Sequence, residues 1–386
     1  MHRTYFKGTH RARLPAETLE LIRPHFPRFG ITRLADVTGL DTLGVPVVLA
    51  VRPLAATLSV SQGKGADLVS AQVSAAMEAI ETWYAEYAVP PAAASGAAAV
   101  ELRLPYRIAD METDARAVAT DSTRLDWVPA AGVRSGTPTL VPRAAVEMRW
   151  QPSAWPPPLI ATSNGLASGN NRWEAVLHGL YEVAERDATA ALADVPAAAR
   201  TYVDPASVDE PNARALLDRL DEHGAWVELV SAPSRVGVTC FVCYLWSPGF
   251  GLSLFSGAGA HSDPAVALSR ALTEAAQSQL TFITGTRDDI GAQVYRPGRR
   301  ILPRPVTTGP LTPWREHVSH VPDAGAVSFE DEARRLAGRI ETVTGTEPLC
   351  VDLRDEEDFC VTKVFCPGLG HMALHDIPRH QEAATR

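Results

Sequence analysis

Apolar residues recur at helical spacing in three long stretches of the chain, at 65–88, at about 172–192 and at 264–285. Glycine and proline rarely interrupt these stretches, so we predict three long helices. Asp263 followed by Pro264 is typical of a capped helix start. Two shorter stretches, 15–26 and 328–345, show the same spacing, and the second is predicted to be an amphipathic surface helix.

Runs of apolar and β-branched residues predict a strand at 45–51 and two strands within 224–247. The Gly-rich segment 249–263 is also strand-like, and 361–370 is predicted to be a final strand and turn. Segment 90–101 is rich in Ala, Pro and Gly and is predicted to be a linker, whereas 150–170 is first Pro-rich and then Gly-rich. No repeat of solenoid period is present. The pattern predicts the α+β class, with helices packed on mixed sheets.

A stripe of polar side chains follows one face of each long helix. Residues i, i+4 and i+7 of a helix share a face, and the intervening residues are mainly apolar. The stripes consist of Ser74, Glu78 and Glu81 in the first helix, Glu174, His178, Glu182 and Glu185 in the second, and Arg270, Glu274 and Gln277 in the third.

Two interpretations of the stripes are open. In the first interpretation the stripes are solvated faces, which is energetically acceptable because an exposed like-charge pair costs only about 0.2–0.5 kcal/mol. Alternatively they are partly buried, and two carboxylates about 6 Å apart at an effective dielectric near 20 then repel by roughly 3 kcal/mol. Partial burial would require protonation or a cation. Converging oxygen ligands suit Mg²⁺, which commonly arrives with nucleotide phosphates.

Two Gly-rich turns are predicted to precede the first and second long helices. The first, 59–67, carries Ser61, Gln62 and Lys64, and the second, 163–170, carries Asn164 and Asn170. A turn that leads into a helix N-terminus can bind phosphate. Ordinary turns and ordinary capping residues remain the alternatives, and neither segment is a Walker A loop.

Composition limits the class of function. The chain has 36 basic and 45 acidic residues, a formal net charge of −9, so its field does not attract nucleic acid unspecifically. Five cysteines, an odd and sparse number, suggest reduced thiols. Cys240 and Cys243 form a CxxC inside a predicted strand, where residues three apart point to opposite faces, so core packing is favoured over metal or redox work. No HExxH motif supports a metal hydrolase.

The first thirteen residues contain no apolar signal core, and the most apolar early run is too short and too interrupted to span a bilayer. We therefore expect a soluble, cytoplasmic protein without a membrane or nucleic-acid partner.

Four elements in series resemble the YcaO family. They are SQGKG at 61–65, SAAMEAIE at 74–81, the segment 163–188 with its ExxERD, and the ExxQ with a preceding Arg within 267–280. The resemblance covers roughly Arg52 to Asp289. Segment 29–53 looks like the N-terminal part of the YcaO subgroup that is usually partnered with TfuA proteins.

This resemblance implies a YcaO-type fold around an ATP and Mg²⁺ site. It implies one composite domain, 1–386, with an N-terminal extension at 1–50, an ATP-binding core at 51–290 and a C-terminal region at 291–386. By motif match, Mg²⁺ and phosphates would be held by Glu78, Glu81, Glu182 and Glu185. Nucleotide contacts would come from Lys64, Ser74, Asn170, Glu174, Arg186, Glu274 and Gln277, and catalysis would depend on Glu182, Glu185 and Arg186. Arg186 also follows Glu182 by four residues, so a helix ion pair is the simpler alternative for it.

The resemblance further implies O-phosphorylation of a peptide backbone amide after a nucleophile has added to its carbonyl. External sulfide, with a TfuA partner and a sulfur donor, yields a thioamide, whereas an internal side chain yields an azoline or amidine in a ribosomally made peptide. The end of the chain lacks the Pro-rich tail typical of azoline-forming members, which favours thioamidation.

Three further expectations accompany the resemblance. No leader-binding domain is evident, so a partner is expected to deliver the precursor peptide or protein. Thr82 stands where many members have Arg, which keeps open a non-catalytic nucleotide-binding partner of another YcaO protein. A homodimer is also possible.

Overall fold

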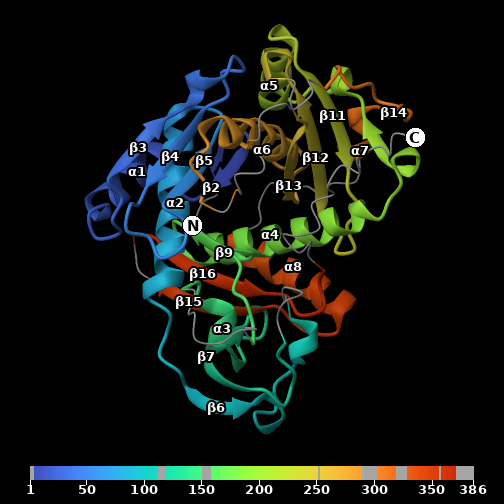
Figure 1. Cartoon of the computed structure of the whole chain (residues 1–386). Coiled ribbons are helices and arrows are strands. Elements are labelled where there is room, and N and C mark those ends of the chain that lie inside the picture. Colours follow the sequence, from blue (N-terminus) through green and yellow to red (C-terminus); the bar gives the residue numbers. More distant parts are fainter. Residues whose placement is uncertain are drawn as a thin grey trace, which may run out of the picture.

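The fold comes from a computed structural model, which describes residues 4–111, 118–149, 158–250, 253–288, 290, 295, 302–318, 328–355 and 358–370 (Figure 1). The C-terminal tail without a Pro-rich motif, part of the Pro-rich segment before 158, and Asp289 lie outside the described residues.

Two small antiparallel sheets form the N-terminal part. A hairpin joins β1 (Thr4–Phe6) to β2 (Thr9–Arg11). A three-stranded sheet has the order β3 (Arg33–Asp36), β4 (Val47–Val51) and β5 (Val60–Lys64). The predicted strand at 45–51 is therefore confirmed as β4.

A five-stranded sheet and a six-stranded sheet make up most of the rest. The five-stranded order is β13 (Phe255–His261), β12 (Thr239–Trp246), β11 (Trp226–Ser231), β10 (Thr201–Val203) and β14 (Leu311–Thr312), in which only β10 and β14 pair in parallel. The six-stranded order is β6 (Ala94–Ala98), β7 (Arg124–Gly132), β15 (Leu349–Asp355), β16 (Cys360–Phe365) and β9 (Leu166–Gly169), with β8 (Pro138–Pro142) also on β7.

The three predicted long helices are α2 (Leu68–Tyr87), α4 (Arg172–Ala193) and α6 (Pro264–Thr284). Their N-caps are Asp67, Asn171 and Asp263, each with a side chain that accepts a backbone N–H in the first turn. The other α-helices are α1 (Pro15–Ile22), α3 (Arg143–Val146), α5 (Pro211–Glu222), α7 (Trp314–Val318) and α8 (Phe329–Thr344). Short 3₁₀ turns occur at 23–25, 38–40, 99–101, 108–110, 197–199, 205–207 and 248–250.

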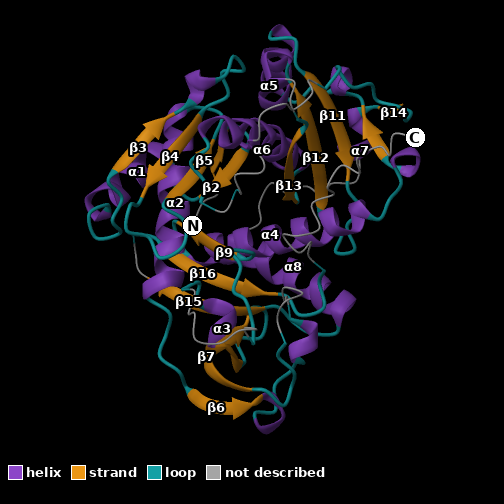
Figure 2. Cartoon of the chain, in the orientation of Figure 1, coloured by secondary structure: helices purple, strands orange, loops and turns teal. Residues whose placement is uncertain are grey.

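The long helices fill the spaces between the sheets (Figure 2). α2 packs on β4 and β5, α6 packs on β13, β12 and β5, and α4 lies between the six-stranded sheet and β13. One buried cluster joins α1 and α2 to β7 and β15, and a second joins α4 and α8 to β12 and β16. This arrangement confirms the α+β expectation. Its physical cause is that each helix has apolar residues to bury on more than one side.

The CxxC cysteines occupy opposite faces of β12, as the strand period predicts. Cys240 packs in the cluster that contains α4 and α8, and Cys243 packs in the cluster that contains α5 and α6. Both thiols are free and buried, and burial raises the pKa of each above its usual range. The core interpretation of this pair is confirmed.

Three local predictions are wrong. The predicted linker at 90–101 contains the edge strand β6, because its backbone pairs with β7 despite a weak composition. The two predicted Gly-rich turns before α2 and α4 consist largely of the strands β5 and β9. Ser61, Gln62 and Lys64 therefore lie on a strand. Asn164 and Gly165, by contrast, lie in a turn before β9, where the φ of Gly165 is +73°, and Asn170 lies in the bend after it.

Glycines of β5 and β13 allow α2 and α6 to approach these strands closely. A Cβ built on Gly63 of β5 would lie 2.0 Å from the backbone N of Ala75 and 2.2 Å from the carbonyl O of Ala71, both in α2. A Cβ on Gly257 of β13 would lie 2.2 Å from the backbone N of Ala275 in α6. The absence of a side chain thus sets how near α2 and α6 come to their strands.

Replacing Gly63 with alanine is expected to lower the free energy of unfolding by about 2 kcal/mol or more, because the helix backbone must move away from β5. Chemical denaturation would measure the change. Gly39→Ala is the matched control, since a Cβ there meets nothing within 4 Å and its φ is not positive. An equal effect in both variants would contradict the close-approach explanation.

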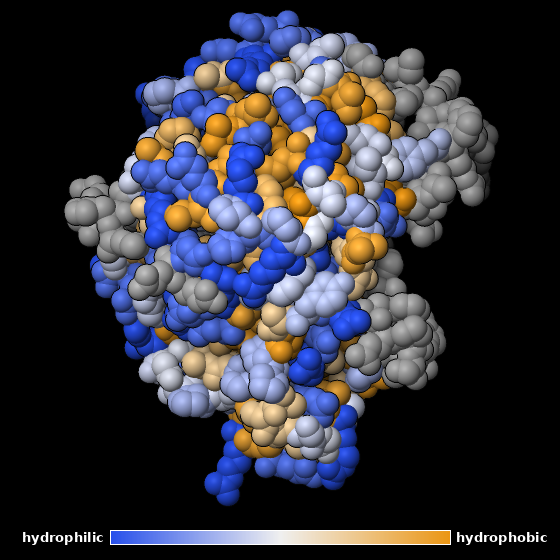
Figure 3. All heavy atoms as spheres, turned by 90° about the vertical axis from the view of Figure 1, so that its left-hand side faces the viewer, coloured by the Kyte–Doolittle hydropathy of each residue, from blue (hydrophilic) through white to orange (hydrophobic). Residues whose placement is uncertain are grey.

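α2 has two chemically different faces. Figure 3 views the side of the molecule that carries β3, α1 and α2, where apolar and hydrophilic residues lie together on the surface. A hollow of about 190 Å³ is lined by Trp83 and Tyr87 of α2 together with Phe29, Arg52, Leu54 and neighbouring residues. Glu78 and Glu81, by contrast, are directed toward the interior.

Among the described helices, none has the length and apolar character needed to cross a bilayer.

Candidate functional site

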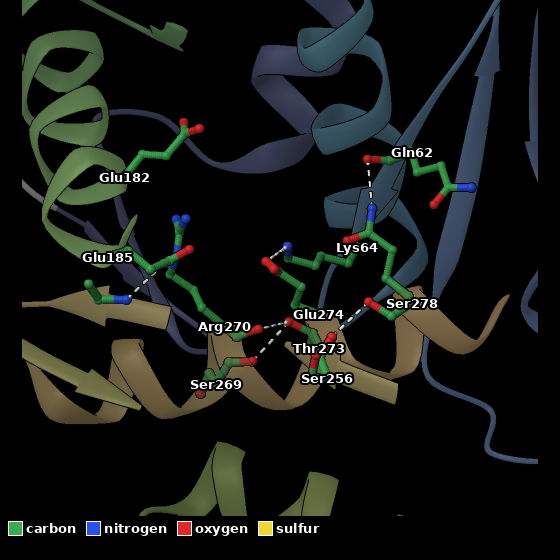
Figure 4. Close-up of polar contacts among 12 residues, drawn as sticks. Gln62, Lys64, Glu182, Glu185, Ser256, Ser269, Arg270, Thr273, Glu274 and Ser278 are labelled. Carbon is green, nitrogen blue, oxygen red and sulfur yellow. Dashed lines mark hydrogen bonds and ion pairs between the residues drawn. The ribbon is translucent and has the colours of Figure 1, made fainter. Parts of the chain in front are cut away.

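Acidic side chains from α2, α4 and α6 share one interior region. The charge of Glu182 in α4 acts on Glu81 in α2, and the charge of Glu274 in α6 acts on both Glu78 and Glu185. Figure 4 shows Glu182, Arg270, Glu274 and Lys64 around the space between α4, α6 and β5. Glu185 is 5% exposed and accepts the N–H of Ala260 in β13 at 3.0 Å. The stripes are therefore not solvated faces.

Burial makes these carboxyls hard to ionise. It raises the pKa of Glu78 to about 7, against the opposing charges of Arg287 and Lys64. Burial, together with the charges of Glu78 and Glu182, raises the pKa of Glu81 to about 8. Burial and the charge of Glu185 raise the pKa of Glu182 to about 7, although the charge of Arg186 opposes the shift. The pKa of Glu185 is also raised, chiefly by burial and by Glu274.

Basic side chains compensate only part of this acidity. Lys64 forms an ion pair with Glu274. Burial alone would raise the pKa of Glu274, but Lys64, Arg186 and Arg270 hold it below its usual range. Arg186 lies 4.0 Å from Glu182, so the helix pair expected from their spacing is present, yet the Arg186 side chain is still 49% exposed. That exposure leaves the guanidinium accessible to a ligand as well.

Asn170 and Glu174 form a second, more buried polar group. The Asn170 Nδ2 donates to Oε1 and Oε2 of Glu174 at 3.1 and 3.3 Å. Glu174 also accepts the N–H of Ala12 at 3.0 Å and pairs with Arg11 at 3.7 Å. Through these contacts the β1–β2 hairpin reaches the N-terminal turn of α4.

Ser74 and Gln277 have weaker links to this region. Ser74 is partly buried on α2, one turn before Glu78. The Gln277 Nε2 donates to the carbonyl O of Gln62 at 2.9 Å and so ties α6 to β5. A contact of either side chain with a nucleotide remains a prediction. Thr82 is buried and donates its hydroxyl to the carbonyl O of Glu78, so it does not replace the phosphate contact of an arginine.

Several residues in this region were absent from the predicted site. They are Arg11, Ser168, His178, Arg270 and Lys363. Lys363 is 2% exposed, donates to the carbonyl O of Asn164 at 2.7 Å, and lowers the pKa of Glu182 by its charge. The single lysine in the apolar run VTKVFC could have indicated a polar site, because a lysine is almost never fully buried unless it has a partner. The sequence around Ser168 carries no comparable signal.

The donor set fits a hard cation with phosphates. Within the described residues, no three His, Cys, Asp or Glu side chains are drawn together tightly enough to hold a metal ion as they stand. The carboxyls nevertheless surround one region, and their raised pKa values show that their ionised forms lack compensation. Carboxylate oxygen is the ligand that Mg²⁺ prefers. Arg270 supplies a buried Nε without a hydrogen-bond partner in the described structure, which suits an anionic ligand.

Comparison with known proteins connects this arrangement to a family. Residues 62–370 match the family model described as YcaO cyclodehydratase, ATP- and Mg²⁺-binding. Uncharacterized protein MT1419 of Mycobacterium tuberculosis is 39% identical over 374 residues, which cover 94% of this chain and 83% of that protein. The uncharacterized protein in the tfuA 3′ region of Rhizobium leguminosarum bv. trifolii is 38% identical over 304 residues, covering 74% of this chain and 70% of that protein.

Solved structures show the same fold. The structure of YcaO from Methanopyrus kandleri, bound with AMPPCP and Mg²⁺, is 26% identical and superposes with a TM-score of 0.70, covering 96% of this chain and 95% of that chain. A heterocyclase in complex with substrate and cofactor is 22% identical, with a TM-score of 0.75 over 96% of this chain and 54% of that chain. The second likeness concerns the fold alone.

Proposed function

The chain belongs to the YcaO family, and from this membership we propose that it activates a backbone amide of a peptide or protein by ATP-dependent O-phosphorylation. The expectation of ATP and Mg²⁺ as cofactors is confirmed at the level of the family, which is described as binding both. The observation that carries the proposal is the set of glutamates on α2, α4 and α6 that surround one interior region, where burial raises the pKa of the four glutamates on α2 and α4.

The described residues divide into proposed roles. Mg²⁺ would be held by the four glutamates Glu78, Glu81, Glu182 and Glu185, and the phosphates would be held through Mg²⁺. Lys64 and Arg186 would share the negative charge of the phosphates, since Arg186 pairs with Glu182 and the charge of Lys64 acts on Glu78 and Glu185. Asn170 and Glu174 would contact the nucleotide, with Ser74, Glu274 and Gln277 lining the remainder of the site. Bound Mg²⁺ supplies charge neutralisation as the terminal phosphoryl group transfers.

The chemistry requires this electrostatic arrangement because an amide oxygen is a poor leaving group. A nucleophile adds to the amide carbon, and the resulting oxyanion takes the terminal phosphoryl group of ATP, releasing ADP. Collapse of this species expels phosphate and leaves the new bond between carbon and nucleophile. With sulfide as nucleophile the product is a thioamide. The proposed contribution of Glu182, Glu185 and Arg186 is to hold the transferring group and its counter-charge in position.

We propose thioamidation with a TfuA-like partner and a sulfur donor as the specific reaction. It is supported by the resemblance of segment 29–53 to the TfuA-associated subgroup and by the similarity to a protein in the tfuA 3′ region of Rhizobium leguminosarum bv. trifolii. Cyclodehydration to an azoline is the second candidate, and it is favoured by the description of the matching family model as a cyclodehydratase.

A mass measurement separates the two reactions. The protein would be incubated with a TfuA-like protein, a candidate precursor peptide, ATP, Mg²⁺ and sulfide. We expect the mass gain of oxygen-to-sulfur exchange, together with one ADP per modification. Loss of water without sulfide would support the azoline reaction. Absence of ADP with either type of peptide, despite nucleotide binding, would contradict both.

A further inference from the structure

A chain of hydrogen bonds crosses the site from α2 to α6. Ser168 of β9 donates its hydroxyl and its backbone N–H to Glu81. The backbone of the same serine is hydrogen-bonded to the imidazole of His178 in α4. The Nε2 of His178 lies 3.2 Å from Nη1 of Arg270 in α6. Four residues on four elements are thus connected in sequence, and the connection at Ser168 passes through its backbone.

The neighbours of His178 determine how its ring is protonated. A guanidinium can only donate, so Nε2 must accept from Arg270. A backbone carbonyl can only accept, so the Nδ1 side of the ring must donate to Ser168. Burial and the charges of Arg270 and Arg11 lower the pKa of His178 well below its usual value, so the ring is neutral.

A neutral acceptor has a specific advantage beside Arg270. The charge of Arg270 acts on Glu182, Glu185 and Glu274, all of which would attract its guanidinium. A carboxylate partner would neutralise Arg270, whereas an imidazole fixes one N–H and leaves the positive charge in place. The Nε of Arg270 is buried and has no hydrogen-bond partner in the described structure, so at least one further donor is available.

We propose that His178 is a positioning residue that holds Arg270 ready for the β- and γ-phosphates of a nucleoside triphosphate and links it through Ser168 to Glu81. This inference rests on the proposed function, because it assumes that the site binds a nucleotide with Mg²⁺. It assigns a role to a residue that lies on the acidic stripe of α4, between Glu174 and Glu182, without being an acid. His178 would not touch the nucleotide itself and would act by fixing the orientation of Arg270.

Nucleotide binding by His178→Leu and His178→Gln tests the proposal. Leucine removes the acceptor, whereas glutamine keeps an oxygen near the position of Nε2. Calorimetry with Mg²⁺ and AMPPCP is expected to show an affinity about tenfold lower for His178→Leu, as for one lost hydrogen bond to a charged group. His178→Gln is expected to remain within about threefold of the unaltered protein. Affinity for AMP, which lacks the β- and γ-phosphates, should not change in either variant.

The outcomes separate positioning from mere structural support. Equal losses for AMPPCP and AMP, or no rescue by glutamine, would overturn the positioning role. Unchanged AMPPCP binding by a folded His178→Leu variant would overturn it as well, while the proposed function would stand. An unaltered protein that binds no AMPPCP with Mg²⁺ would overturn both. His223→Leu, at the exposed end of α5, is the control and should bind as the unaltered protein does.

A double-mutant cycle tests the link to Glu81. Ser168→Ala removes the hydroxyl that donates to Glu81. If the four groups act as one unit, the loss in AMPPCP affinity for Ser168→Ala combined with His178→Leu should be smaller than the product of the two single losses. Independent, multiplicative losses would overturn the link while leaving the contact between His178 and Arg270 intact.

Discussion

Replacement of Glu182 with glutamine is expected to reduce ATP-dependent ADP release at least about 100-fold while the chain remains folded. Glu182 lies in the acidic region, where its charge interacts with those of Glu81, Glu185 and Arg186. Glutamine preserves the shape of the side chain but removes the charge that would hold the cation. The measurement is steady-state ADP release in the presence of the peptide substrate and Mg²⁺.

The same variant is expected to be more stable than the unaltered protein without ligand at pH 8. Ionised Glu182 is poorly compensated, since its pKa rises from 4.5 to about 7 on burial. A difference of about 2.5 in pKa corresponds to about 3 kcal/mol as an upper limit. Glu222→Gln in α5 is the control, because that glutamate is exposed and outside the site. ADP release at the unaltered rate by Glu182→Gln would exclude the proposed metal role of Glu182.

The second large effect concerns the dependence of stability on pH. Below pH 4.5 the carboxyls of Glu78, Glu81 and Glu182 are protonated in both the folded and the unfolded chain. As the pH rises from 4.5 to about 7 or 8, the unfolded chain ionises first, because burial raises all three pKa values in the folded protein. The folded state therefore binds more protons over this range, and its stability falls by several kcal/mol until both states are ionised.

Mg²⁺ with AMPPCP is expected to reverse this loss. A cation compensates the ionised carboxylates, so the increase in melting temperature on adding both should be larger at pH 8 than at pH 6, with protons released on binding. Thermal unfolding monitored by circular dichroism would measure the increase, and pH titration calorimetry would count the protons. Mg²⁺ without nucleotide is the control for a general salt effect. An increase that is the same at both pH values would contradict the proposed role of the three glutamates.

The three long helices illustrate what local pattern can predict. Apolar spacing and the cap at Asp263 depend on residues within a few positions of each other, so α2 and α6 begin and end close to where the sequence places them. The stripe that includes Glu182 and Glu185 was visible for the same reason. The pattern could not predict whether the stripes meet in the interior or face solvent. Helical spacing shows which side chains share a face but not what covers that face.

The segments around Lys64 and Ser168 show the opposite case. Their glycines suggested turns, but Gly63 and Gly169 lie on strands, since each serves close packing against α2 or α4 rather than chain reversal. Local composition cannot separate these two uses of glycine. The difference is decided by a helix that lies several residues further along the chain.

The amino-acid sequence by itself determined the long helices, the cap at Asp263, the acidic stripes and the resemblance to a family that binds ATP and Mg²⁺. Only the tertiary structure decided that glutamates from three helices are buried around one region and that Arg11, Ser168, His178, Arg270 and Lys363 accompany them. The physical reason is that a periodic pattern records which side of an element is polar. Burial, charge coupling and the tautomer of a histidine depend on atoms contributed by distant parts of the chain.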